Sequence, residues 1–309
     1  MEEPTENKRR KVCSGFLRII DIDNVPNQKH HRTVFIVAIS SLNIFIHLLT
    51  YINISWQGQP FRYALSSIFM FFIPCMRPTS DAIRLLNIRC NSLESNKTCY
   101  YNDRLQGICS SFMYPYQLWR FFTASLFHMV WYHLVINVSK QALYGFLLER
   151  KYGTIRVSII YWLSALSSCL TFMLEHREAP GFGASGSIYG LIIFLIVDRL
   201  VALQENTEHR TFILLQIIVL IVLPNAPTII SIYIFKLNVA HSAHVGGGLV
   251  GLLLGIGMIG CPLPWNYRQC HFRTMCRCIA FTLLFIYFTI TVSTFFLMDA
   301  PVCHWLFAL

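Results

Sequence analysis

A serine set among small residues and a histidine followed by glycines are the residues of this sequence best suited to chemistry. Ser185 stands in the run Gly183-Ala184-Ser185-Gly186, and His244 stands in the run His244-Val245-Gly246-Gly247. A serine hydroxyl becomes a nucleophile at neutral pH when a neighbouring base accepts its proton, and histidine is the usual base. The two residues could therefore carry out acyl transfer if the fold brings them together.

Each motif alone also has a purely structural explanation. Small residues such as Gly, Ala and Ser let helices pack closely in membranes, so the serine motif by itself favours packing over catalysis. His241 lies one turn before His244 on the same helix face and is a rival base. Gly247 and Gly251 follow His244 on that face, which predicts that another helix approaches it closely.

A second polar pair precedes the serine motif in the chain. His133 and Asn137 are four residues apart, so both side chains project from one helix face. Donors held there in a low dielectric could stabilise an oxyanion beside Ser185. The alternative is a polar network that only fixes helix packing. His128 stands a few residues earlier and is expected to hold water or to orient the loop.

The elements that must position these residues are long apolar helices. The chain of 309 residues is 55% hydrophobic and 13% charged, whereas soluble domains carry about 25% charged residues. A membrane-spanning helix needs roughly 20 apolar residues. Seven segments approach that length: 33–54, 121–147, 155–174, 184–201, 211–235, 240–260 and 279–298. The sequence predicts an all-α, polytopic transmembrane bundle of seven spans that resides in a lipid bilayer.

The distribution of charge predicts the topology. The net charge is +10, and basic residues cluster in 8–32, 150–156 and 268–277. These clusters fall on one side of a membrane if the N-terminus is cytosolic, as the positive-inside rule expects. The basic excess is thus explained without a nucleic-acid partner. Residues 1–32 are predicted to be a cytosolic polar tail, and residues 33–309 one membrane domain with a large external loop at 55–118.

The predicted external loop has its own features. Its four cysteines could form two disulfides in three possible pairings, and Asn96 stands in a glycosylation sequon, Asn96-Lys97-Thr98. Residues 61–74 are apolar but too short to span a membrane, so they are either an interfacial or re-entrant helix or a packing element. The cysteines concerned are Cys75, Cys90, Cys99 and Cys109.

Taken together, the motifs over about residues 119–255 resemble the rhomboid family of intramembrane serine proteases. Trp119-Arg120 resembles the family's Trp-Arg loop motif, and His133 with Asn137 its His-xxx-Asn element. The run around Ser185 matches the family's GxSG motif. The last family motif corresponds to His244, Gly247 and Gly251.

The resemblance implies a role for each residue. Ser185 would be the nucleophile, and His244 rather than His241 the base, because the family's base is followed three residues later by Gly. His133, Asn137 and the Ser185 amide would form the oxyanion hole. Tyr189, one turn after Ser185, would pack on the catalytic histidine.

The predicted function is an intramembrane serine endopeptidase that cleaves single-span transmembrane proteins near the external face of the bilayer. By family analogy no metal or organic cofactor is needed, and span five, with Gln216 and Pro224, would be the substrate gate. A seventh span after a six-helix core resembles the secretase-type rhomboids, which places the protein in the secretory pathway or plasma membrane. The alternative is a catalytically inactive rhomboid-like protein that binds transmembrane clients for trafficking or degradation.

Overall fold

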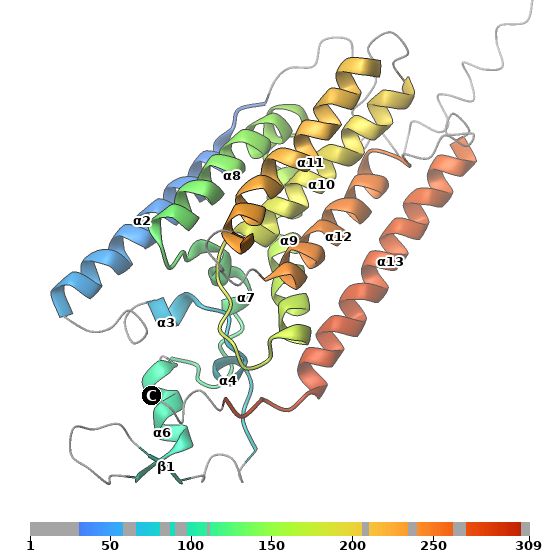
Figure 1. Cartoon of the computed structure of the whole chain (residues 1–309). Coiled ribbons are helices and arrows are strands. Elements are labelled where there is room, and N and C mark those ends of the chain that lie inside the picture. Colours follow the sequence, from blue (N-terminus) through green and yellow to red (C-terminus); the bar gives the residue numbers. More distant parts are fainter. Residues whose placement is uncertain are drawn as a thin grey trace, which may run out of the picture.

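The computed structural model describes residues 31–57, 66–80, 87–89, 98–109, 112–205, 210–233, 240–261 and 270–303. Most of the predicted polar tail and the sequon at Asn96 lie outside these residues. The predicted all-α bundle is confirmed, and Figure 1 shows its long helices running side by side. The long helices are α2 (Val34–Gln57), α8 (Trp131–Tyr152), α9 (Thr154–Glu175), α10 (Ser185–Glu205), α11 (Arg210–Tyr233), α12 (His241–Met258) and α13 (Cys270–Leu297).

The number of spans depends on one bent helix pair. Among the described residues, six helices are long and apolar enough to cross a membrane, and the count reaches seven if each bent pair is one span. The bent pair is Arg120–Leu126 followed by α8, with an angle of 98° between its parts. A multi-pass membrane protein follows from these helices.

The prediction of one continuous second span over 121–147 is wrong. The chain forms α7 (Arg120–Thr123) and the 3-10 turn η2 (Ala124–Leu126), and α8 begins only at Trp131. Polar contacts with distant residues hold the break open. The buried Arg120 donates from Nη1 to the carbonyl oxygen of Met70 at 2.7 Å, and the carbonyl of His128 accepts from His47 Nδ1 at 2.9 Å.

Helices α10 and α12 pack with their backbones in contact. A Cβ atom added at Gly247 would lie 1.9 Å from the carbonyl oxygen of Gly186, and one at Gly251 would lie 2.1 Å from that of Gly190. Neither position can carry a side chain without pushing the two helices apart. Helix α9 packs against both of them. This contact brings the start of α10 next to the first turn of α12.

The carboxylate of Glu149 fixes the start of α2. Its oxygens accept the backbone N–H groups of Val34, Phe35 and Ile36 at 3.0, 2.8 and 2.9 Å, and the hydroxyl of Thr154 donates to it at 2.7 Å. The first N–H groups of a helix have no partner within the helix, and a negative charge there is stabilised by the helix dipole. One buried carboxylate from α8 thus joins the starts of α2 and α9.

We expect Glu149→Ala to destabilise the protein by about 3 kcal/mol, because it leaves three backbone donors without their charged acceptor. The measurement is the thermal unfolding midpoint in detergent, which should fall by several degrees. Arg150→Ala is the matched control, since this neighbouring side chain is exposed. Equal midpoints for the two variants would contradict the capping role.

The described parts of residues 66–109 (66–80, 87–89 and 98–109), called the interspan segment, lie at the end of the bundle where α10 and α12 begin (Figure 1). The segment contains α3 (Ser66–Phe69), α4 (Ile73–Met76), the antiparallel strands β1 (Asn87–Arg89) and β2 (Thr98–Tyr100), and α6 (Tyr101–Ile108). In β1 and β2, Ile88 pairs with Cys99.

No continuous helix covers the described part of the apolar stretch 61–74. Two single turns, α3 and α4, flank Phe71, whose N–H and C=O both bond to Gly181 at 2.8 Å. Pro74 in the first turn of α4 also has no N–H with which to continue a helix. Because residues 70–76 are buried, the packing alternative describes residues 70–74. Residues 61–65 lie outside the described part of the chain.

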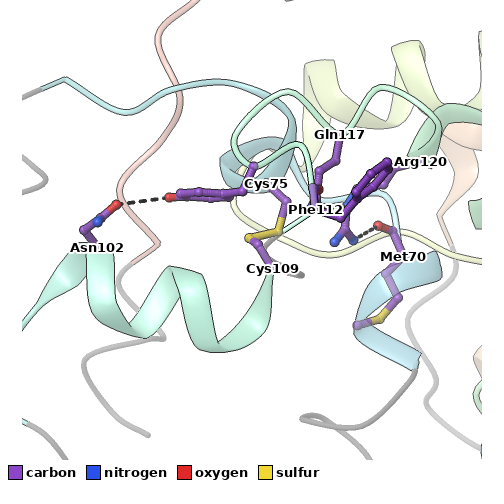
Figure 2. The surroundings of a disulfide bond; sticks show 8 residues. Met70, Cys75, Asn102, Cys109, Phe112, Gln117 and Arg120 are labelled. Atoms are coloured by element: carbon purple, nitrogen blue, oxygen red, sulfur yellow. Dashed lines mark hydrogen bonds between the residues drawn. A yellow bond between two sulfur atoms is a disulfide. The ribbon is translucent and has the colours of Figure 1, made fainter.

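A disulfide between Cys75 and Cys109 joins α4 to the end of α6, with the Cα atoms 5.4 Å apart. Of the three pairings open from the sequence, only the one that leaves Cys90 with Cys99 contains this bond, although Cys90 lies outside the described residues. Figure 2 shows Gln117 and Arg120 next to the disulfide. The N–H of Gln117 donates to the carbonyl of Cys75 at 3.2 Å, so the bond also anchors the turn that precedes α7.

The chain after α13 returns to the interspan segment. Cys303 lies in one buried cluster with Tyr101 and both disulfide cysteines, and its N–H donates to the Tyr101 hydroxyl at 2.9 Å. Burial raises the pKa of the Tyr101 phenol above its ordinary value, so the hydroxyl stays neutral. The last described residues are therefore packed against the interspan segment at this end of the bundle.

Candidate active site

The structure brings Ser185 and His244 into hydrogen-bond contact. Nε2 of His244 lies 3.0 Å from Oγ of Ser185. Ser185 is the first residue of α10, and His244 lies one turn into α12, so the backbone contact between the two helices sets this distance. When Nε2 is the unprotonated ring nitrogen, it accepts the hydroxyl proton, which is the arrangement a serine nucleophile needs.

His241, the rival base, is placed differently. Its side chain is exposed, and its ring stands perpendicular to that of His244 with the centroids 6.5 Å apart. Among the described residues, the Ser185 hydroxyl forms a side-chain hydrogen bond with His244 and none with His241. The geometry therefore singles out His244 as the residue placed to take the serine proton.

A glycine turn places the start of α10 beside His133 and Asn137. Gly183 has a φ of +112°, a value that L side chains rarely adopt. A Cβ at Gly183 would lie 3.0 Å from Cε1 of His133 and 3.9 Å from Nδ2 of Asn137. As the first residue of α10, Ser185 also presents one of the helix's unpaired N–H groups. The side chains of His133 and Asn137 thus lie against the turn that leads into Ser185.

Gly186 lets α9 approach the serine turn. A Cβ added there would lie 2.0 Å from Oγ of Ser168 and 3.1 Å from the carbonyl oxygen of Ala243. This glycine is therefore in contact with α9 on one side and α12 on the other.

His128 is buried and lies between Asn137 and the serine turn. Its Nε2 is 3.0 Å from Nδ2 of Asn137 and 3.4 Å from the N–H of Ala184. With Nε2 unprotonated, His128 accepts from both groups and holds the Asn137 amide near Ser185. Of the two roles expected for His128, these contacts correspond to orientation of the loop.

Trp119 and Arg120 lie in the loop before α7. Arg120 bonds to Met70 and, from Nε, to Oε1 of Gln117 at 2.8 Å (Figure 2). Trp119 packs on Phe112 with ring centroids 5.5 Å apart. Both side chains thus bind other parts of the loop and the interspan segment.

Tyr189 covers one face of the His244 ring. The two rings are stacked, with centroids 4.2 Å apart and an angle of 15° between their planes. The Tyr189 hydroxyl donates to Oδ1 of Asn225, on α11, at 2.7 Å. The sequence motifs did not identify Asn225. A polar residue between two prolines in an apolar span was the available signal, since such residues are costly in hydrocarbon.

A small cavity of about 50 Å³ opens beside Ser185. It has room for about three water molecules. Ser125, Ser168 and Ser187 are among the lining residues, together with Phe172. Sequence reasoning did not identify these serines, because each comes from a different element and only the fold brings them together.

Comparisons with known proteins identify a domain match and several relatives. A family profile for the rhomboid domain matches residues 115–261. RHOMBOID-like protein 1 of Arabidopsis thaliana is 27% identical over 160 residues, which cover 52% of this chain and 39% of the relative. Rhomboid protease GlpG of Haemophilus influenzae is 23% identical over 141 residues, covering 45% of this chain and 69% of the relative.

One relative is named as inactive. Inactive RHOMBOID-like protein 8 of Arabidopsis thaliana is 30% identical over 77 residues, covering 25% of this chain and 22% of the relative. The chain spans 39%, 53% and 44% of the length of three plant relatives that it matches. The matched segment contains the serine turn, both histidine motifs and the glycine contact between α10 and α12. The chain is therefore a multi-pass membrane protein that carries a rhomboid domain over residues 115–261.

Proposed function

We propose that this protein is an intramembrane serine endopeptidase that cleaves single-span transmembrane proteins. The observation that carries the proposal is the 3.0 Å contact between Ser185 Oγ and His244 Nε2. It occurs where two helices pack backbone to backbone, so the contact has little freedom to vary. Proximity and orientation of this kind are a large part of enzymatic rate enhancement.

The reaction follows from the placement of these groups. Ser185 Oγ attacks the carbonyl carbon of the scissile peptide bond while His244 Nε2 takes its proton. The negative charge that develops on the carbonyl oxygen is stabilised by His133, Asn137 and the Ser185 amide. His244 then protonates the leaving nitrogen, the C–N bond breaks and an acyl-enzyme remains. A water molecule, deprotonated by His244, attacks the ester and releases Ser185.

The cavity beside Ser185 supports the second half of this reaction. Hydrolysis of the acyl-enzyme needs water at a position that an apolar bundle would otherwise exclude. Several serines are among the residues that line this cavity, and their hydroxyl groups could bind water there. The cavity is thus a place from which the hydrolytic water reaches the ester.

Substrate entry would take place beside α11, as the family analogy for Gln216 and Pro224 suggests. In α11, 22% of the most apolar window is buried, against 61% in α10. Helix α11 is therefore a peripheral helix, whereas α10 is central. Nζ of Lys140, on α8, donates to the carbonyl oxygen of Pro224 at 2.7 Å, and this bond would break when α11 moves away from α8.

The proposed setting is the secretory pathway or the plasma membrane, with the N-terminus in the cytosol and the start of α10 at the external face. The Cys75–Cys109 disulfide supports it, since disulfides persist in oxidising compartments. Asn96 would then carry a glycan. The helix after the rhomboid domain, α13, is consistent with a secretase-type arrangement.

A non-catalytic binder of transmembrane clients is the second candidate, because one relative is named as inactive. The contact between Ser185 and His244 favours the protease, since a binder has no need of a serine–histidine hydrogen bond at this position.

The test is reaction of Ser185 with a fluorophosphonate probe, combined with cleavage of a panel of single-span reporter proteins in liposomes. The wild type should be labelled and should cleave at least one reporter. Ser185→Ala should lose labelling and at least about 10³-fold in cleavage rate. Cleavage that persists in Ser185→Ala would refute the proposal. Reporter binding without cleavage or labelling by the wild type would favour the binder.

A further inference from the structure

The side chain of Asn225 is held in one orientation on α11. Its Nδ2 donates to the carbonyl oxygen of Ile221, on the same helix, at 2.6 Å. Its Oδ1 accepts the hydroxyl hydrogen of Tyr189, on α10, at 2.7 Å. The bond within α11 therefore turns the amide so that Oδ1, rather than Nδ2, faces α10 and accepts from Tyr189.

The ring of Tyr189 in turn fixes the plane of His244. The rings are nearly parallel, 15° apart, with centroids at 4.2 Å. In the described part of the chain, the His244 ring has one hydrogen-bond partner, Ser185. In serine–histidine–aspartate sites, a third group bonded to the second ring nitrogen orients the base. Here the orientation of the imidazole depends on its stacking partner.

We propose that Asn225 is a positioning residue for the reaction, acting on His244 through Tyr189. By holding the phenol ring in place, Asn225 orients His244 indirectly, whereas the carboxylate of a triad bonds to the histidine directly. This inference rests on the proposed protease function. Its physical basis is a chain of three contacts, from Asn225 to Tyr189, from Tyr189 to His244 and from His244 to Ser185.

The same turn of α11 is also bound from the other side. Pro224 precedes Asn225 and accepts a hydrogen bond from Lys140 of α8. Two polar contacts, one to α8 and one to α10, thus set where this turn lies, and both are strong in a low dielectric. A displacement of α11 from α8 carries Asn225 away from Tyr189. The position of α11 and the alignment of the base are therefore linked.

A double-mutant cycle tests the inference. Tyr189→Phe keeps the stacked ring but loses the donor, and Asn225→Leu keeps the side-chain size but loses the acceptor. Each should lower kcat and the rate of fluorophosphonate labelling about tenfold, with KM for the cleaved reporter little changed. The double variant should fall no further than the lower single variant. Asn225→Asp, which retains an acceptor oxygen, should recover most of the loss.

Val222→Ala is the matched control, since this side chain on α11 is 58% exposed. Losses that multiply in the double variant would show that Asn225 acts independently of Tyr189 and would overturn the inference. An Asn225→Leu defect that is fully explained by a lower thermal unfolding midpoint would also overturn the inference.

A spectroscopic readout separates this inference from the proposed function. The imidazole resonances of His244 are displaced by the ring current of the stacked Tyr189. Asn225→Leu should move them towards unstacked values, and Val222→Ala should not. Unmoved resonances would overturn the inference even in an active enzyme. Moved resonances in a chain that neither cleaves nor labels would uphold the positioning contact and refute the protease.

Discussion

Replacing His244 with alanine should abolish fluorophosphonate labelling of Ser185 and lower cleavage by at least about 10³-fold. The reason is geometric: Nε2 of His244 is the basic atom 3.0 Å from the serine hydroxyl. Without it the hydroxyl keeps its proton and is a poor nucleophile at neutral pH. The measurements are the rate of labelling and the rate of reporter cleavage in liposomes.

His241→Ala is the control for this prediction. His241 lies on the same helix three residues earlier, and its exposed ring is perpendicular to that of His244. Its removal should change the rates less than about threefold, as exposed substitutions usually do. Equal losses in the two variants would contradict the assignment of His244 as the sole base, because both histidines would then be needed for the reaction.

Gly247→Ala should have the second large effect, although it adds a single methyl group. That Cβ would lie 1.9 Å from the carbonyl oxygen of Gly186, and backbone atoms cannot move aside as a flexible side chain does. Helices α10 and α12 must therefore separate by an ångström or more, which takes Ser185 out of reach of His244. A displacement of about 1 Å at a reacting pair costs about 100-fold in rate.

Gly248→Ala provides a matched control one residue further along α12. Its Cβ would meet only Cγ1 of Ile193, at 3.3 Å, and that side chain can adjust. Labelling, cleavage and the thermal midpoint should stay close to the wild type in Gly248→Ala and fall together in Gly247→Ala. Wild-type labelling in Gly247→Ala would mean that the backbone contact does not set the distance between Ser185 and His244.

The helices of the bundle were predictable because each is a long apolar run. The predicted span 155–174 corresponds to α9 (Thr154–Glu175), and the predicted span 184–201 to α10 (Ser185–Glu205). The break before α8 was not predictable from this signal, since the apolar run continues through it. Bonds from Arg120 to Met70 and from His128 to His47 hold it. Those partners are more than 40 residues away in the chain.

Some features of the candidate site were likewise predictable from the sequence, and others were not. The close approach at His244 was predictable, because Gly247 and Gly251 repeat at helical spacing and leave a bare face. The role of Asn225 was not predictable, because it depends on a contact with Tyr189 of another helix. Helix α11 also shows no periodic polar face that would mark this residue. The pairing of Cys75 with Cys109 was equally open, since four cysteines have three pairings of equal standing in sequence.

The glycine contact between α10 and α12 has a consequence for the motions of the protein. Side-chain interfaces yield by changes of rotamer, but two touching backbones have no such freedom. Helices α10 and α12 should therefore behave as one rigid body that keeps its internal spacing while the bundle around it fluctuates. Conformational change in this protein must then pivot on interfaces made of side chains, and the serine and histidine travel through it as a unit.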